Sequence, residues 1–353
     1  MATQVDLRID VTNEVSLGEP AHVAASIVLP DPDCLPERPL VCFAKPGGGY
    51  STGYYTCELP GPGQAAQASW HVARGWIFVA IDNLGSGSSS SHDPDCLDFA
   101  VMTEAAHAAE QDILLRMANG VLLDGYPPVH QPTIIGIGQS MGASLVIYQQ
   151  SRRRGYDGLG ILGFSAVHSH PVTPPGEPPI VVSWFPRGSD RDEVEEPLNA
   201  AVMEAAMASG PEGSEWKSLA WGFHYDDVPY EVVEQDLVHY DAIARGEGLP
   251  DGIEPAPWNS YATPGKAARS TLTPGVVATE AAAITVPVLS IMGVRDLVPD
   301  PYGEARAFRS SRSVDLFICP RMGHMHNFAG TRELFWERIH SFGNWCAAVK
   351  AAG

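Results

Sequence analysis

The residues Thr133-Ile-Ile-Gly-Ile-Gly-Gln-Ser-Met-Gly-Ala-Ser144 predict a strand, a sharp turn and the start of a helix. An apolar run comes first, Gly-x-Ser-x-Gly follows at residues 138–142, and a helical pattern then continues to Arg154. A sharp strand-to-helix turn forces strained backbone angles on the central serine, and glycines two positions away on each side let neighbouring backbone approach closely. The Ser140 hydroxyl would then project at a helix N-terminus, where backbone N–H groups favour developing negative charge. The stretch therefore predicts a nucleophilic serine.

Other short apolar runs lie on either side of this turn in the sequence. They fit parallel strands buried on both faces. They cover Leu40–Ala44, Trp76–Ile81, Leu159–Val167, Val286–Met292 and Val314–Cys319. Helical patterns occupy Val101–Asn119 and Arg332–Val349. Near the N-terminus, Val5–Val11 and Ala21–Leu29 alternate around a Gly/Pro turn, which predicts an antiparallel hairpin. Strands that alternate with helices predict an α/β fold, with a mostly parallel central sheet flanked by helices.

Composition and charge exclude several classes of function. The 353 residues include 42 Asp and Glu against 22 Lys and Arg, a formal net charge of −20. Such a chain argues against binding to nucleic acid or to an anionic membrane surface, because both need clustered basic residues. The six cysteines form no Cys-x-x-Cys pair and are too sparse for a disulfide framework. We expect a cytoplasmic protein with a small-molecule partner and no transmembrane helix; its oligomeric state stays open, a homodimer included.

One long stretch breaks the alternation of strands and helices. From His168 to about Ala283 no strand–helix unit is visible, and a proline-rich segment opens the stretch. Helical patterns follow near Glu193–Ala208 and Glu231–Ala244, and aromatic residues are dense. These features predict a helical cap inserted into the domain, with a cleft for a ligand between cap and sheet. The predicted domains are a first part of the core at 1–167, the cap at 168–283 and a second part of the core at 284–353.

The segment around Ser140 resembles the nucleophile elbow of the α/β-hydrolase superfamily. A second segment, Trp76–Ser88, is similar to that superfamily's strand and loop with the pattern Asp-x-x-Gly-x-Gly-x-Ser, which begins here at Asp82. Leu84 stands where the superfamily usually has an arginine. The resemblance covers nearly the whole core. It implies the α/β-hydrolase fold, in which the acid and then the histidine follow the serine along the chain.

The resemblance also implies which residues are the acid and the base. The run from Val286 leads into Gly-x-x-Asp, which is similar to the superfamily's acid-bearing turn and assigns Asp296 as the acid. The run from Val314 leads into Gly-His, which assigns His324 as the general base. His326, two residues further on, is the alternative base. The predicted triad is Ser140, Asp296 and His324.

A glycine-rich loop follows the first core strand. Lys45-Pro46-Gly47-Gly48-Gly49 resembles the superfamily's His-Gly-Gly-Gly loop, with Lys-Pro where the histidine would be. Only glycines let backbone N–H groups turn towards an oxyanion without an intruding side chain. The resemblance assigns the N–H groups of Gly48 and Met141 to the oxyanion hole, with Gly49 as the alternative to Gly48.

Side chains near these motifs are candidates for lining a substrate pocket. They are Tyr50, Tyr54, Gln139, His168 and Trp221. The histidines and aspartates between His168 and Asp227 match no standard metal-ligand spacing, and serine chemistry needs no metal. We therefore expect neither a metal ion nor a cofactor.

These motifs imply a serine hydrolase that cleaves a carboxylic ester or lactone through an acyl-enzyme. The aromatic-rich cap and the acidic chain favour a moderately sized, largely apolar substrate. The same residues could instead hydrolyse a carbon–carbon bond or transfer an acyl group, and the fold can also serve as a small-molecule receptor. A serine nucleophile argues against haloalkane dehalogenase and epoxide hydrolase chemistry, for which this superfamily uses Asp.

Overall fold

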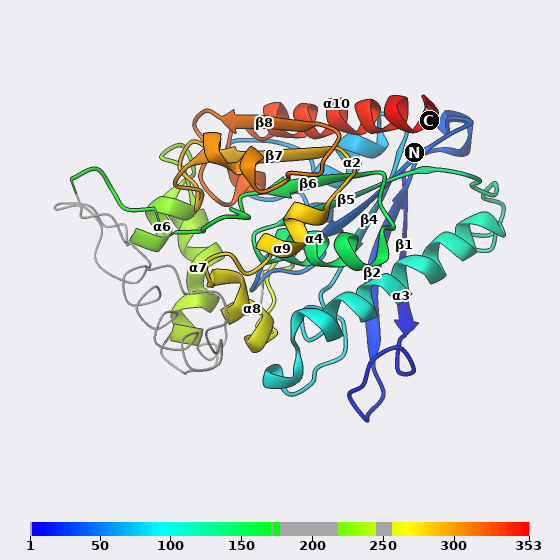
Figure 1. Ribbon diagram of the computed structural model, residues 1–353, viewed down its shortest axis with the longest axis horizontal. Coiled ribbons are helices and arrows are strands. Elements are labelled where there is room, and N and C mark those ends of the chain that lie inside the picture. Colours follow the sequence, from blue (N-terminus) through cyan, green and yellow to red (C-terminus); the bar gives the residue numbers. More distant parts are fainter. Residues whose placement is uncertain (1, 171, 177–217, 245–255, 353) are drawn as a thin grey trace.

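A computed structural model describes residues 2–170, 172–176, 218–244 and 256–352. Within these ranges the strands form one eight-stranded sheet in the order β1-β2-β4-β3-β5-β6-β7-β8 (Figure 1). The strands are β1 (Thr3–Asp10), β2 (His22–Leu29), β3 (Leu40–Lys45), β4 (Trp76–Ile81), β5 (Thr133–Gln139), β6 (Gly158–Leu162), β7 (Val288–Gly293) and β8 (Val314–Cys319). β2 pairs antiparallel with β1 and β4, and the other pairings are parallel. The predicted hairpin and mostly parallel sheet are thus confirmed.

Helices cover both faces of the sheet. They are α1 (Gly53–Thr56), α2 (Gln67–Val72), α3 (Phe99–Ala118), α4 (Met141–Arg153), α6 (Ser218–Phe223), α7 (Tyr230–Ala244), α8 (Gly265–Leu272), α9 (Ala278–Ala283) and α10 (Arg332–Ala351). The described residues also form short 3-10 turns, namely η1 (Pro32–Cys34), η2 (Pro94–Cys96), η3 (Pro301–Arg306) and η4 (His326–Phe328). α10 runs along one face, and α3 and α4 lie on the other (Figure 1).

The hydrophobic core is two clusters, one on each face of the sheet. Successive residues of a strand point to opposite faces. In β3, Val41 and Phe43 accordingly belong to the cluster with α3 and α4, whereas Cys42 and Ala44 belong to the cluster with α2 and α10. All six residues of β3 are buried, as the continuous apolar run predicted.

Local signals set where the elements begin and end. The side chain of Asp98 caps α3 by accepting a hydrogen bond from the N–H of Val101. Arg154 ends α4 in the left-handed conformation, with φ at 51°. β6 is shorter than the predicted run Leu159–Val167, because Gly163 has φ at 58° and turns the chain out of the sheet.

The insertion between β6 and β7 contains α6, α7, α8 and α9. α7 covers the helix predicted at Glu231–Ala244, whereas the helix predicted at Glu193–Ala208 lies outside the described residues. In Figure 1, α6 and α7 lie beyond the carboxyl ends of the parallel strands. In the described ranges no helix combines the length and the apolar character needed to cross a membrane.

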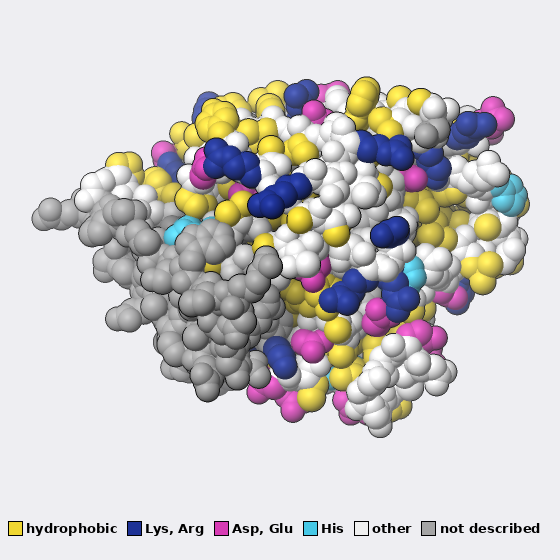
Figure 2. All heavy atoms as spheres, in the orientation of Figure 1, with side chains coloured by type: hydrophobic (Ala, Val, Ile, Leu, Met, Phe, Trp, Pro, Cys, Tyr) yellow, Lys and Arg dark blue, Asp and Glu magenta, His cyan; other side chains and the backbone are white. Residues whose placement is uncertain are grey.

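Charged side chains are dispersed on the face of the molecule seen in Figure 2. Lys and Arg side chains there lie singly or in small groups among acidic, apolar and uncharged side chains. On the described part of this face, neither sign of charge covers a continuous area.

A buried histidine makes the stability of the fold depend on pH. His71 of α2 is fully buried, its ring stacks on Trp76 with centroids 4.4 Å apart, and neither ring nitrogen has a hydrogen-bond partner among the described residues. Burial, with smaller effects of His340 and Arg74, lowers the pKa of His71 well below its usual value. The unfolded chain therefore takes up a proton below about pH 6.5 that the folded protein excludes, so stability falls as the pH falls.

We expect His71→Phe to remove this dependence while keeping the ring stack. Between pH 7.5 and 5.5, the wild type should lose about 1 kcal/mol of unfolding free energy relative to the variant. Urea denaturation of both proteins at the two pH values measures the difference. An equal loss of stability in the two proteins would contradict the assignment.

Candidate active site

Ser140 lies at the turn between β5 and α4. Its backbone angles are φ 54° and ψ −118°, a strained conformation for a residue with a side chain. A Cβ on Gly138 would lie 2.2 Å from the backbone of Gly142, and a Cβ on Gly142 would lie 2.2 Å from the carbonyl oxygen of Lys45. Both glycines are therefore required by close backbone contact, as expected for this motif. The serine side chain is half-buried at the N-terminus of α4.

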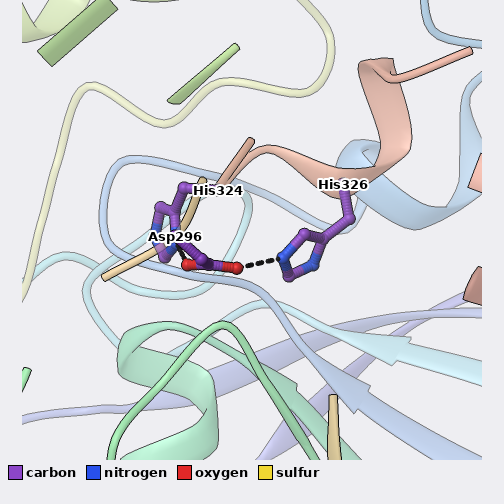
Figure 3. A group of neighbouring side chains, drawn as sticks. All are labelled: Asp296, His324 and His326. Carbon is purple, nitrogen blue, oxygen red and sulfur yellow. Dashed lines mark hydrogen bonds and ion pairs between the residues drawn. The ribbon is translucent and has the colours of Figure 1, made fainter. Parts of the chain in front are cut away.

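The loops after β7 and β8 bring Asp296 and His324 together. Nδ1 of His324 lies 2.7 Å from Oδ1 of Asp296, and both side chains are 1% exposed (Figure 3). The N–H of Leu297 also donates to Oδ1, at 2.7 Å, and the N–H of Gly293 donates to Oδ2, at 2.9 Å. The carboxylate is thus fixed by backbone at the end of β7 and faces the imidazole.

His326 contacts the same carboxylate from the other side. Its Nε2 lies 2.9 Å from Oδ2 of Asp296, so the carboxylate stands between two imidazole rings (Figure 3). Gly163 packs against all three side chains, since a Cβ there would lie 2.9 to 3.1 Å from His326, His324 and Asp296. A larger residue at position 163 would collide with all three side chains.

The other ring nitrogen of His324 faces Gln139. Nε2 of His324 lies 3.2 Å from the amide nitrogen of Gln139, which also donates to the carbonyl oxygen of His324 at 3.3 Å. Within the described residues, Ser140 Oγ makes no hydrogen bond to either imidazole. In this arrangement His324 donates through Nδ1 and carries a lone pair on Nε2, which is the tautomer that a base needs. Ser140 Oγ would have to replace the Gln139 amide to give up its proton there.

Electrostatics favour the ionised form of Asp296. Burial by itself would raise the pKa of the carboxyl, but attraction to His324 and the hydrogen bonds from His324 and His326 bring it below its usual range. Burial lowers the pKa of His326, and this effect outweighs the attraction of Asp296. The site thus holds a buried carboxylate next to a neutral ring at position 326.

Asp296, His324 and His326 lie close enough to one another to be considered as ligands of a metal ion. The nitrogen and oxygen atoms that Asp296, His324 and His326 offer lie within 4.8 Å of one another. However, each carboxylate oxygen faces a different ring at hydrogen-bond distance, 2.7 and 2.9 Å. We interpret the group as one carboxylate hydrogen-bonded to two imidazole rings.

The loop predicted to hold the oxyanion packs against the start of α4. The contact is between backbone atoms, because a Cβ on Gly142 would lie only 2.2 Å from the carbonyl oxygen of Lys45. A Cβ on Gly48 would lie 3.9 Å from the sulfur of Met141, so the two predicted donors belong to neighbouring residues in space. Gly49, with φ at 81°, accepts a hydrogen bond from the N–H of Ser260 through its carbonyl oxygen. The roles of Gly48, Gly49 and Met141 as donors stay predictions.

A buried ion pair anchors the same loop. Nζ of Lys45, at 1% exposure, contacts Glu110 of α3 at 2.5 Å and the hydroxyl of Tyr156 at 2.8 Å. The amide of Gln149 on α4 donates to the second carboxylate oxygen of Glu110 at 2.6 Å. The sequence offered one sign of this network, because Lys45 stands where the superfamily's loop has a histidine. It did not indicate which residues would pair with the lysine.

A second buried carboxylate joins the loop after β3 to the insertion between β6 and β7. Asp236 of α7 accepts hydrogen bonds from the hydroxyl of Tyr50 at 2.8 Å, from Nε2 of His224 at 2.9 Å and from Nε1 of Trp258 at 2.9 Å. Tyr50 also forms an isolated antiparallel bridge with Asn259. The loop after β3 is thus held by the insertion as well as by the core. No sequence pattern pointed to Asp236.

The residues predicted to line a pocket lie in different environments. Tyr50 and Tyr54 are fully buried, and Tyr54 accepts a hydrogen bond from the N–H of Asn327 through its hydroxyl. The ring of Trp221 packs against Arg295, whose guanidinium carbon lies 4.0 Å from the centroid of that ring. His168 lines a cavity of about 630 Å³ beside α9 and η3. Of the five predicted residues, Gln139 is the one in direct contact with His324.

A family model described as "Alpha/beta hydrolase family" matches residues 43–335. This chain belongs to the alpha/beta hydrolase family. The match begins in β3, includes the segments with Ser140, Asp296 and His324, and ends in α10. The resemblance noted from the motifs is therefore confirmed at the level of family and fold.

Solved structures of several enzymes share this fold. A loop variant of a haloalkane dehalogenase from Bradyrhizobium elkanii is 14% identical, with a TM-score of 0.55 over 100% of this chain and 99% of that chain. A bromoperoxidase from Bacillus anthracis (TM-score 0.56) and a thermophilic esterase from Thermogutta terrifontis (TM-score 0.55) are each 15% identical, over 96% of this chain and 99% of theirs. At such identities the likeness extends to the fold alone. No curated protein matches the sequence.

Proposed function

We propose that this alpha/beta hydrolase is a serine hydrolase that cleaves a carboxylic ester or lactone with Ser140, His324 and Asp296. The observation that carries the proposal is the 2.7 Å contact between Nδ1 of His324 and Asp296, at the edge of the sheet where the strained turn presents Ser140. A carboxylate on Nδ1 places the lone pair on Nε2, where it can act as a base once Ser140 Oγ replaces the amide of Gln139.

The mechanism needs two proton transfers at Nε2 of His324. Ser140 Oγ loses its proton to Nε2 as it attacks the carbonyl carbon, while Asp296 stabilises the imidazolium. The proton then passes to the leaving oxygen as the ester C–O bond breaks, which gives an acyl-enzyme and an alcohol. Water repeats both transfers and releases the acid. The N–H groups of Gly48 and Met141 would hold the oxyanion in each step.

The substrate we propose is of moderate size and largely apolar. Aromatic residues are dense in the insertion, and a net charge of −20 does not attract anions. Carbon–carbon bond hydrolysis and acyl transfer to an alcohol or thiol use the same three residues, so they remain variants of this proposal.

A small-molecule receptor is the second candidate. The observation that favours it is the amide of Gln139 at Nε2 of His324, where an active triad would have the serine hydroxyl. A receptor of this kind would keep the residues of a hydrolase without turning over its ligand.

Turnover separates these candidates. We expect p-nitrophenyl esters or lactones to give many product molecules per protein molecule, with a rate that falls on the acid side as the imidazole becomes protonated. A panel that adds vinylogous diketones, and alcohols as acyl acceptors, distinguishes the three reactions by their products. Tight binding with less than one product molecule per protein molecule would favour the receptor.

A further inference from the structure

We propose that His326 is a positioning residue, which shares the Asp296 carboxylate with His324 and thereby limits how strongly that carboxylate holds a proton on His324. The inference deepens the proposed function and rests on it for its kinetic test. It assigns His326 a task other than that of an alternative base.

The carboxylate of Asp296 has a full set of donors. Oδ1 accepts from Leu297 N–H and from His324, and Oδ2 accepts from Gly293 N–H and from His326. A carboxylate offers about four lone-pair directions, so these bonds saturate it. The two backbone donors fix where the carboxylate lies, and the two rings compete for its charge.

The ring of His326 has one hydrogen bond to make. Its Nε2 must carry the proton that is donated to Asp296, and its Nδ1 is buried without a partner among the described residues. The ring packs on Phe335 of α10, with centroids 4.3 Å apart. An apolar ring would fill this space without leaving a buried nitrogen unsatisfied. The hydrogen bond from Nε2 to Asp296 is therefore the interaction that requires a histidine at position 326.

The same geometry argues against His326 as the base. Its Nε2 is engaged by Asp296, and its Nδ1 has no donor or acceptor next to it among the described residues. His324 instead directs Nε2 towards Gln139, the residue that precedes Ser140. The two rings stand 6.1 Å apart, on opposite sides of the carboxylate (Figure 3).

The surroundings leave few other charges to act on this pair. Gln139 of β5 and Phe223 of α6 face His324, and Phe335 of α10 faces His326; none of them titrates. The hydroxyl of Tyr54, which feels the charge of Asp296, has its pKa raised by burial and stays neutral. Asp296 and the two imidazoles are thus the titrating groups of the site in the described part of the chain.

Removing the second donor should make His324 hold its proton more strongly. A hydrogen bond to Oδ2 draws negative charge away from Oδ1, and without it more charge faces the imidazolium. His326→Phe keeps the stack on Phe335 but loses the donor. His326→Gln places an amide nitrogen near the position of Nε2 and keeps the donor.

The pH dependence of kcat/KM in both variants tests the proposal. In His326→Phe, the acid limb should move to higher pH by about half a unit or more, and the rate above the limb should fall by no more than about tenfold. In His326→Gln, the limb should return towards that of the wild type. If His326→Phe does not fold, His326→Met takes its place, since Met adapts to irregular space.

Two results would overturn the assignment. Equal shifts in the Gln and Phe variants would mean that His326 acts by filling space. A loss of turnover as large as that of Ser140→Ala, together with activity in His324→Ala, would make His326 the base.

An NMR titration of His324 in the same variants does not depend on turnover. A higher midpoint for His324 in His326→Phe than in the wild type supports the proposal, and an unchanged midpoint contradicts it. If no substrate is cleaved by the wild type, the proposed function fails while this titration still decides the role of His326.

Discussion

Ser140→Ala should reduce ester cleavage by a factor on the order of 10⁶, because loss of a nucleophile removes the acyl-enzyme route altogether. The hydroxyl makes no hydrogen bond in the described part of the chain, and alanine keeps the Cβ at the strained turn. The free energy of unfolding should therefore change by less than about 1 kcal/mol. Initial rates with a p-nitrophenyl ester and urea denaturation measure the two quantities.

Ser151→Ala is the matched control for this variant. Ser151 lies on the same helix, α4, near its C-terminus, and bonds to the carbonyl oxygen of Tyr148. Its replacement should leave turnover near that of the wild type. If Ser140→Ala retained a tenth of the wild-type rate with unchanged KM, the proposed nucleophile would be wrong.

Lys45→Met should destabilise the fold by about 3–5 kcal/mol, because it leaves the carboxylate of Glu110 buried without its positive partner. The lysine and glutamate side chains are 1% and 3% exposed, so solvent does not screen them. The hydroxyl of Tyr156 and the amide of Gln149 remain as donors but carry no charge. Urea denaturation at neutral pH measures the loss.

The double variant Lys45→Met/Glu110→Gln controls for the loss of packing. The amide oxygen at position 110 still accepts from the hydroxyl of Tyr156, while its NH2 group replaces the oxygen that accepts from Gln149 and can donate to the Gln149 side-chain oxygen once that amide rotates. The amide brings no buried charge. The double variant should therefore regain more than half of the stability that Lys45→Met loses. A cost below about 1 kcal/mol for Lys45→Met alone would show that this charge pair is not buried as described.

The elbow around Ser140 could be predicted because its requirements are local. Gly138 and Gly142 are needed because backbone atoms only a few residues apart in the chain come into close contact there. The Gly-x-Ser-x-Gly pattern therefore indicates the turn directly. Asp296 and His324 were assigned from the resemblance of Gly-x-x-Asp and Gly-His to the superfamily's motifs. The sheet explains why the two side chains meet, because the carboxyl ends of parallel strands lie at one edge.

The contacts that surround the site depend on packing between distant segments. Nothing in the sequence indicates that Asp236 would accept a hydrogen bond from Tyr50, which lies 186 positions away. His326 follows His324 by two residues, and the sequence does not reveal that both rings would reach one carboxylate. The contact of Gln139 with Nε2 of His324 likewise joins residues 185 positions apart. Side-chain geometry of this kind exists only once the core is packed.

Covalent labelling shows whether Ser140 is a reactive nucleophile. The folded protein is treated with a fluorophosphonate, and its intact mass and its peptides are then measured. We expect one adduct per molecule, on Ser140, and none on Ser140→Ala. A folded wild-type protein that stays unlabelled, or an adduct at another residue with Ser140 unmodified, would contradict this expectation.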